Sequence, residues 1–235
     1  MLKIEKTLIV SPLMPADCRQ TLVSMGFILA FSPALDGVQE SVKYHPDMQL
    51  VKGNGVWICA PQVFDYYKQI FDKCCLKLIC GGSTLGCDYP HDIAYNAAVI
   101  GDFAIHNFKY TDSVFAENTQ CAKISVAQGY TKCNLCIVSD NAAITSDNGI
   151  YRALSDKNID VLKIDAGNII LPGYDYGFIG GASGLIDDGT LAFCGNLNLH
   201  PQGELIKKFC ANHGVSAISL GNAPLMDIGT IIRPA

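Results

Sequence analysis

The stretch Leu8-Ile9-Val10-Ser11-Pro12 is an apolar run that leads into a helix signal, and it is the first of five similar stretches. The other four are Trp57-Ile58-Cys59-Ala60-Pro61, Phe103-Ala104-Ile105-His106-Asn107, Ala143-Ile144-Thr145-Ser146-Asp147 and Leu191-Ala192-Phe193-Cys194-Gly195. They begin about 40 to 50 residues apart, a period typical of arrays of supersecondary units. In such an array no unit buries its apolar face alone.

The sequence between these strands completes each unit. Helices are predicted at about 15–25, 63–74, 113–122, in the segment after Asp147, and at 201–213, from Pro, Gly and N-cap signals. Short buried strands follow at 27–31, 76–80, 124–127, 161–164 and 215–218. Hairpin turns then lead to the next unit at Gly53-Asn54-Gly55, Gly101-Asp102, Asp140-Asn141 and Asp187-Asp188-Gly189.

The two chain ends are out of phase with this repeat. The chain begins with a helix-entering strand at 7–10 and ends with its missing hairpin partner at 227–232. Their pairing would complete the fifth unit and remove the exposed sheet edges. We therefore predict one α/β domain over 1–235, a pseudo-fivefold α/β propeller of strand-helix-strand-strand repeats closed by its terminal strands. An ordinary α/β sheet with periodic alternation is the alternative.

Composition excludes several classes of protein. The 235 residues are 49% hydrophobic and 17% charged, which excludes a disordered chain. The net charge of -5 argues against a nucleic-acid partner. The start Met1-Leu2-Lys3-Ile4-Glu5-Lys6 lacks a signal-peptide pattern, and no apolar run is long enough to cross a membrane. We expect a cytoplasmic protein with reduced cysteines, because the count of 11 is odd and several lie in apolar strands.

A closed ring of five such units resembles the pentein superfamily, the fold of guanidino-group-modifying enzymes. Arginine deiminases, dimethylarginine hydrolases, agmatine deiminases and amidinotransferases belong to it, together with non-catalytic members. The resemblance covers essentially the whole chain. Residues 171–181, Leu-Pro-Gly-Tyr-Asp-Tyr-Gly-Phe-Ile-Gly-Gly, resemble an uncharacterised bacterial branch.

The resemblance implies a catalytic pattern that this sequence matches only in part. In pentein enzymes an H-x-D motif supplies a His for proton transfer and an Asp that pairs with the guanidinium, and His45-Pro46-Asp47 has this form. A Cys near the C-terminal end attacks the guanidino carbon, but the corresponding segment, Gly221–Thr230, contains no Cys. The nucleophile is therefore missing from its usual place.

Polar residues recur where the predicted hairpins begin. If the ring closes, these strand ends converge near one end of its axis and form an acidic funnel that suits a cation. The catalytic candidates are His45, as acid or base, with Asp47 and His91; the ligand-binding candidates are Asp92, Asn134, Asp175 and Asp227. Alternatively, each Asp satisfies backbone donors at a strand entrance.

Cys133-x-x-Cys136 is the one CxxC in the sequence. A zinc site of the usual kind needs a second pair, and on a strand positions three apart point to opposite faces. We therefore expect no metal and no cofactor, with a His/Asp/Cys metal site on the axis as the remaining alternative. Cys133 is a candidate nucleophile if it faces the funnel near a His, and otherwise a buried structural residue.

Two functions follow from these residues. The first is a non-catalytic or atypical pentein-like protein whose acidic axial pocket binds a small cationic ligand, guanidino or amino-acid-like, or a partner. The second is a hydrolase or amidinotransferase that acts on a guanidino compound with His45 and a non-standard nucleophile. The sequence indicates no nucleic-acid or membrane partner and leaves the oligomeric state open.

Overall fold

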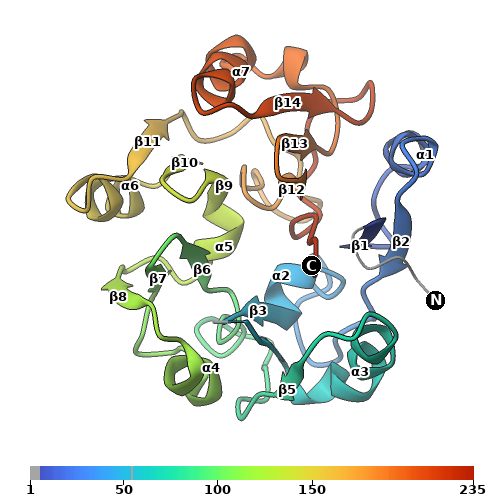
Figure 1. The fold of residues 1–235 in the computed structure, drawn as a ribbon, viewed down its shortest axis with the longest axis vertical. Helices are drawn as coiled ribbons and strands as arrows, with labels where there is room; N and C mark the ends of the chain where they lie inside the picture. The colour runs from blue at the N-terminus through green and yellow to red at the C-terminus, as the bar shows by residue number, and fades with distance from the viewer. Residues whose placement is uncertain (1–5, 54) are drawn as a thin grey trace.

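The computed structural model describes residues 6–53 and 55–235 of the chain. Residues 1–5, used above to argue against a signal peptide, and Asn54 of the first predicted turn lie outside this part. The described residues form small sheets grouped around a common centre, with most helices toward the outside (Figure 1). The chain therefore has a mixed α/β fold with several small sheets.

Four of the sheets share one topology. A first strand pairs with a second in antiparallel fashion, and after a helix a third strand pairs in parallel with the second. These sheets contain β3 (Leu50–Lys52), β4 (Trp57–Cys59) and β5 (Leu78–Cys80); β6 (Ala98–Ile100), β7 (Phe103–His106) and β8 (Ala122–Ser125); β9 (Leu135–Ser139), β10 (Ala142–Thr145) and β11 (Asp160–Lys163); β12 (Ser183–Asp187), β13 (Thr190–Phe193) and β14 (Ser216–Ser219).

The remaining sheet contains β1 (Thr7–Val10) and β2 (Ile28–Phe31), which pair in parallel. Its antiparallel contact comes from the other end of the chain. Ile9 and Ile232 form a bridge in which Ile9 N lies 2.8 Å from Ile232 O and Ile232 N lies 3.0 Å from Ile9 O. In the described residues the predicted pairing of the chain ends is thus one bridge long, and it does not join the sheets into one closed sheet.

Helices connect the second and third strands of each unit. They are α1 (Ala16–Ser24), α3 (Phe64–Lys73), preceded by a 3₁₀ turn at Pro61–Val63, α4 (Ser113–Asn118), α6 (Asn148–Ser155) and α7 (Gly203–Asn212), preceded by a 3₁₀ turn at Leu197–Leu199. The predicted N-caps are confirmed, because the Asp112 and Asp147 carboxylates accept hydrogen bonds from Phe115 N and Ile150 N. The third helix ends earlier than predicted, since Thr119 has an extended backbone.

Two single-turn helices stand where strand starts were predicted. They are α2 (Pro46–Gln49), before β3, and α5 (Thr131–Asn134), before β9. Cys133 therefore lies on a helical turn while Cys136 lies on a strand. The prediction that both sit on one strand was wrong, because strand geometry begins only at Leu135.

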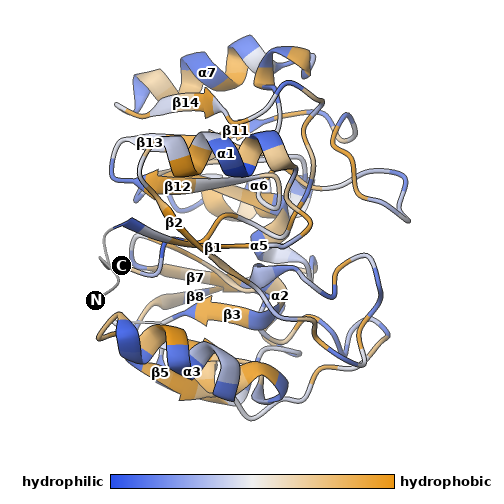
Figure 2. Cartoon of the chain, turned by 90° about the vertical axis from the view of Figure 1, so that its right-hand side faces the viewer, coloured by the Kyte–Doolittle hydropathy of each residue, from blue (hydrophilic) through white to orange (hydrophobic). Residues whose placement is uncertain are grey.

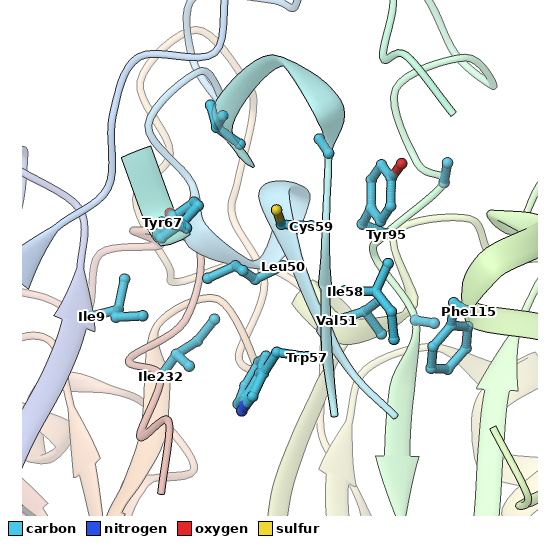
Figure 3. Packing of buried hydrophobic residues seen from close by; sticks show 14 of the residues in the cluster. Ile9, Leu50, Val51, Trp57, Ile58, Cys59, Tyr67, Tyr95, Phe115 and Ile232 are labelled. Atoms are coloured by element: carbon cyan, nitrogen blue, oxygen red, sulfur yellow. The ribbon is translucent and has the colours of Figure 1, made fainter. Parts of the chain in front are cut away.

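One hydrophobic cluster of the core joins the two end segments of the chain to the second unit. Strands are largely hydrophobic, whereas the helices also carry hydrophilic residues (Figure 2). Ile9 and Ile232 lie beside Leu50 and Trp57 (Figure 3). Trp57 is 7% exposed, as predicted for a core residue, and its indole N–H donates to Pro234 O at 2.9 Å. Among the described residues, no helix combines the length and apolar character needed to span a bilayer.

His106 makes the stability of the fold depend on pH. One ring nitrogen lies 2.6 Å from Thr111 Oγ1 and the other lies 2.9 Å from Gly129 O, and burial lowers the pKa of His106 to about 4. The unfolded chain takes up this proton below about pH 6.5, whereas the folded chain does so only near pH 4. Stability from this residue is therefore present above pH 6.5 and lost as the pH falls toward 4.

We expect wild type to lose about 2 to 3 kcal/mol more unfolding free energy than His106→Gln between pH 7 and pH 4.5. Urea denaturation of both proteins at the two pH values measures the difference. Other titrating groups are common to both proteins and cancel. Equal losses in the two proteins would contradict the assignment.

Candidate functional site

Four ionisable side chains from distant parts of the sequence meet near the middle of the molecule. They are His45, Asp47, Cys133 and Asp227, here called the axial centre. Each is almost fully buried: Asp47 is 0% exposed and the other three are 3% exposed. His45 and Asp47 are positioned by α2, Cys133 by α5, and Asp227 by the C-terminal segment. The structure therefore brings together four of the residues singled out in the sequence.

The donor and acceptor atoms of the axial centre lie within a few ångströms of one another. Cys133 Sγ donates to Asp47 Oδ2 at 3.2 Å. One His45 ring nitrogen, one Asp47 oxygen and Cys133 Sγ all lie within 4.8 Å of each other. His45 Nδ1 is 3.8 Å from Asp227 Oδ1. Among the described residues, His45 Nδ1 and Asp47 Oδ1 are buried and have no hydrogen-bond partner.

Two glycines allow this close approach. A Cβ on Gly229, which has a φ of +75°, would lie 2.3 Å from His45 Cβ. A Cβ on Gly181 would lie 2.0 Å from Asp227 Oδ1. Each distance is far below a van der Waals contact, so any larger side chain here would displace a residue of the axial centre.

Backbone amides fix the Asp227 carboxylate. Its Oδ2 accepts from Phe178 N at 2.9 Å, and its Oδ1 accepts from Gly229 N at 3.0 Å. The backbone N–H of Asp47 in turn donates to Gly229 O at 3.1 Å. The C-terminal segment and α2 are therefore held together by main-chain hydrogen bonds as well as by side chains.

Asn96 and Thr230 support the axial centre and were not predicted. Asn96 Nδ2 lies 3.0 Å from both Asp47 O and Cys133 Sγ. The Thr230 hydroxyl lies 2.7 Å from Asp47 Oδ2, and Lys132 Nζ is 3.2 Å from Thr230 Oγ1. Asn96 comes just before β6 as Asp47 comes just before β3. The recurrence of polar residues where hairpins begin would have identified Asn96 if the start of β6 had been predicted correctly.

The other sequence candidates lie outside the axial centre. His91 and Asp175 are exposed. Asp92 is buried, and its Oδ2 accepts from the Tyr130 hydroxyl at 2.6 Å. Asn134 Nδ2 donates to Tyr130 O at 3.0 Å. The hydrogen bonds of Asp92 and Asn134 thus go to Tyr130 on the neighbouring loop, and the funnel is smaller than predicted.

Burial shifts every ionisable group of the axial centre toward its neutral form. It raises the pKa of Asp227 to about 6 and also raises the pKa of Asp47. The pKa of the Cys133 thiol is well above its usual value because of burial and the nearby carboxylates. Burial lowers the pKa of His45. A cation entering the centre would favour the ionised carboxylates.

A cavity of about 450 Å³ reaches the axial centre. Asp47, Lys132 and Thr230 contribute to its wall, and the rest comes mainly from β3, β6, β9, β12 and the C-terminal segment. A larger surface depression of about 670 Å³ lies against α1 and β2, with Arg19 as the one charged residue in its described lining. Of the two, only the cavity that reaches the axial centre offers carboxylates, Asp47 and Asp140, to a cationic ligand, and its wall also carries Lys52, Lys132 and Arg233.

The model of a family described as "Family of unknown function (DUF6873)" matches residues 9–232. No curated protein sequence matches the chain. Among solved structures, the chain is similar to SxtG, an amidinotransferase from Microseira wollei in the saxitoxin biosynthetic pathway. The TM-score is 0.52 and the identity 10%, over 92% of this chain and 88% of that one.

Two further structures match over a similar length. One is DDAH from Pseudomonas aeruginosa complexed with citrulline, with a TM-score of 0.52, 10% identity, and 92% of each chain covered. The other is the inosamine-phosphate amidinotransferase StrB1 from Streptomyces griseus, with a TM-score of 0.54, 9% identity, and 95% and 93% covered. These are pentein-fold proteins, so the likeness identifies the fold of this chain as pentein-like. At such low identity it shows the fold alone.

The Tyr130–Asp92 contact provides a test of the polar network beside the centre. Tyr130→Phe removes the one hydrogen bond to Asp92 Oδ2, while Oδ1 already lacks a partner among the described residues. We expect a loss of about 1–3 kcal/mol of unfolding free energy in urea denaturation, the cost of an unsatisfied buried group.

Tyr66→Phe is the matched control, because the Tyr66 hydroxyl donates to Phe31 O in an exposed contact. It should change stability by about 0.5 kcal/mol or less. Equal effects of the two substitutions would show that burial of Asp92 does not set the cost.

Proposed function

The chain belongs to the family of unknown function DUF6873, and on that premise we propose that its axial centre binds a small cationic ligand of guanidino or amino-acid-like character. The observation that carries the proposal is the burial of the Asp47 and Asp227 carboxylates close to His45. Buried carboxylates are costly unless a cation or hydrogen-bond donors compensate them. Asp47 Oδ1 has no such donor among the described residues.

A guanidinium group suits this arrangement. Its planar fork of N–H donors pairs with carboxylates through two parallel hydrogen bonds. The cavity that reaches Asp47 has room for an amino-acid-sized molecule at about 450 Å³. The pentein-like fold supports the same ligand class, because DDAH of this fold was solved with citrulline bound.

The proposal includes the finer architecture. We take the chain to be a single pentein-like domain over 1–235, a closed propeller of five units from an uncharacterised bacterial branch, located in the cytoplasm. The Ile9–Ile232 bridge supports closure, since it joins the first sheet to the last segment of the chain.

An enzyme of the same ligand class is a second candidate, favoured by one observation. Cys133 Sγ lies within 4.8 Å of a His45 ring nitrogen. Cys133 comes from the middle of the chain, whereas the resemblance to pentein enzymes implies a nucleophile near the C-terminal end. In this reaction His45 takes the proton of the Cys133 thiol, the resulting thiolate forms an S–C bond to the guanidino carbon, and the departing amine takes that proton from His45 as its C–N bond breaks. Water then gives a proton to His45 and forms a C–O bond to the same carbon, and the S–C bond breaks to give a ureido product and the reprotonated Cys133 thiol.

Ligand binding is tested by thermal shift with agmatine, arginine, methylarginines and creatine, on protein treated with a chelator. A binding compound at about 100 times its Kd should stabilise the fold by about 2.7 kcal/mol. Citrulline, whose ureido group is neutral, should give a smaller shift. Asp227→Asn and Asp47→Asn should each remove the ligand-induced shift, measured against their own ligand-free state.

Asp160→Asn is the control variant, because Asp160 pairs with His213 at the surface. It should keep the full shift. The ligand proposal fails if no compound shifts wild type, or if Asp227→Asn shifts as much as wild type does.

The enzyme candidate is tested by incubating the same compounds with chelator-treated protein and measuring released ammonia or amine. Cys133→Ser should abolish release by removing the nucleophile. Cys136→Ser should retain it, since Cys136 lies on β9 with Ser183 as its hydrogen-bond neighbour. Turnover that persists in Cys133→Ser, or no turnover of any compound, would exclude this candidate without affecting the binding test.

A further inference from the structure

The axial centre contains the donor types of a transition-metal site. Imidazole nitrogen, thiolate sulfur and carboxylate oxygen are the protein ligands of zinc. In the described residues, His45, Asp47 and Cys133 form the one group of three or more such side chains with donor atoms this close together. All three are buried, so solvent does not compete for these atoms.

The distances are close to those of a tetrahedral site. With Zn–N and Zn–O of about 2.0–2.2 Å and Zn–S of about 2.3 Å, neighbouring donors lie about 3.3–3.7 Å apart. Cys133 Sγ is 3.2 Å from Asp47 Oδ2, and His45 Nδ1 is 3.8 Å from Asp227 Oδ1. The three-residue group as a whole lies within 4.8 Å. Shifts of about 1.5 Å or less would therefore bring the donor atoms of His45, Asp47 and Cys133 to tetrahedral spacing.

Two buried polar atoms of the centre are available to bind a ligand. His45 Nδ1 and Asp47 Oδ1 are buried and accept or donate no hydrogen bond among the described residues. Buried polar atoms are otherwise almost always paired. A bound cation would satisfy both atoms, whereas no side chain in the described structure does.

The surroundings have the features of an outer shell. Asn96 Nδ2 lies 3.0 Å from Cys133 Sγ, and the Thr230 hydroxyl lies 2.7 Å from Asp47 Oδ2. Such contacts orient metal ligands. Charge also balances: a thiolate and two carboxylates carry three negative charges, and Zn²⁺ together with the nearby Lys132 ammonium carries three positive ones. The cavity that reaches Asp47 gives an ion a way in.

We propose that His45, Asp47 and Cys133 bind one Zn²⁺ ion, with the Asp227 carboxylate beside them at 3.8 Å from His45 Nδ1. The site replaces the expectation of no metal, which treated Cys133 and Cys136 as residues of one strand. The inference goes beyond the proposed organic ligand and does not require it, although both would occupy the same carboxylates and hence compete.

The test uses the purified full chain, stripped with a chelator and titrated with Zn²⁺ alone against a chromophoric chelator. We expect one equivalent to bind with high affinity. Cys133→Ser and His45→Gln should each weaken binding at least about 100-fold, and Asn96→Ala about 10- to 100-fold. Cys80→Ser, at an exposed thiol, should leave the affinity unchanged.

Co²⁺ in place of Zn²⁺ gives a spectroscopic readout of the ligands. A thiolate ligand produces a sulfur-to-cobalt charge-transfer band, expected in wild type and Cys80→Ser and absent in Cys133→Ser. If Cys133→Ser does not fold, His45→Gln keeps the thiol and should change the visible d–d bands instead. Absence of Zn²⁺ binding, or equal affinity in wild type and both centre variants, overturns the metal site.

The outcomes of the two proposals are separable. If guanidino compounds raise the melting temperature of chelator-treated protein but the titration finds no bound Zn²⁺, only the metal inference is overturned. If Zn²⁺ binds but no guanidino compound raises the melting temperature, only the organic-ligand proposal is overturned. If both bind, adding Zn²⁺ should reduce the guanidino shift, and a shift unaffected by Zn²⁺ would place the ion away from Asp47 and Asp227.

Discussion

The contact between the two chain ends is the constraint on which the axial centre depends. The Ile9–Ile232 bridge fixes the C-terminal segment against the first sheet, and Ile231 N donates to Ser183 O at 3.0 Å on its other side. Held between two sheets in this way, the segment presents Asp227 and Thr230 to α2. The main-chain contacts of one strand-like segment thus decide whether the acidic residues meet.

Much of the fold could be predicted because the repeat is local. Strand positions, hairpin turns and the caps at Asp112 and Asp147 depend on residues close together in sequence. The single helical turns at α2 and α5 could not, because four residues are too few to show a helical period. That difference matters for the site, since α5 carries Cys133 and turns its sulfur toward Asp47.

The candidate site was predictable in part for the same reason. His45, Asp47 and Asp227 stand at matched positions in their units, and the structure brings them together. Asn96 was missed because the start of β6 was placed too early, whereas Thr230 contacts Asp47 across 183 residues of sequence, a contact that no spacing pattern encodes. His91 and Asp175 also precede predicted hairpins but lie on exposed loops. Residue type and position in the repeat therefore do not by themselves tell which polar residues are buried at the centre.

The wide sequence separation of the centre's residues also has a kinetic meaning. Asp47 meets Cys133 across 86 residues and Thr230 across 183, so long loops must close before these atoms are neighbours. A partly folded chain that has formed only its local hairpins has no such cluster. Occupancy of the centre would therefore report that these long-range contacts have formed.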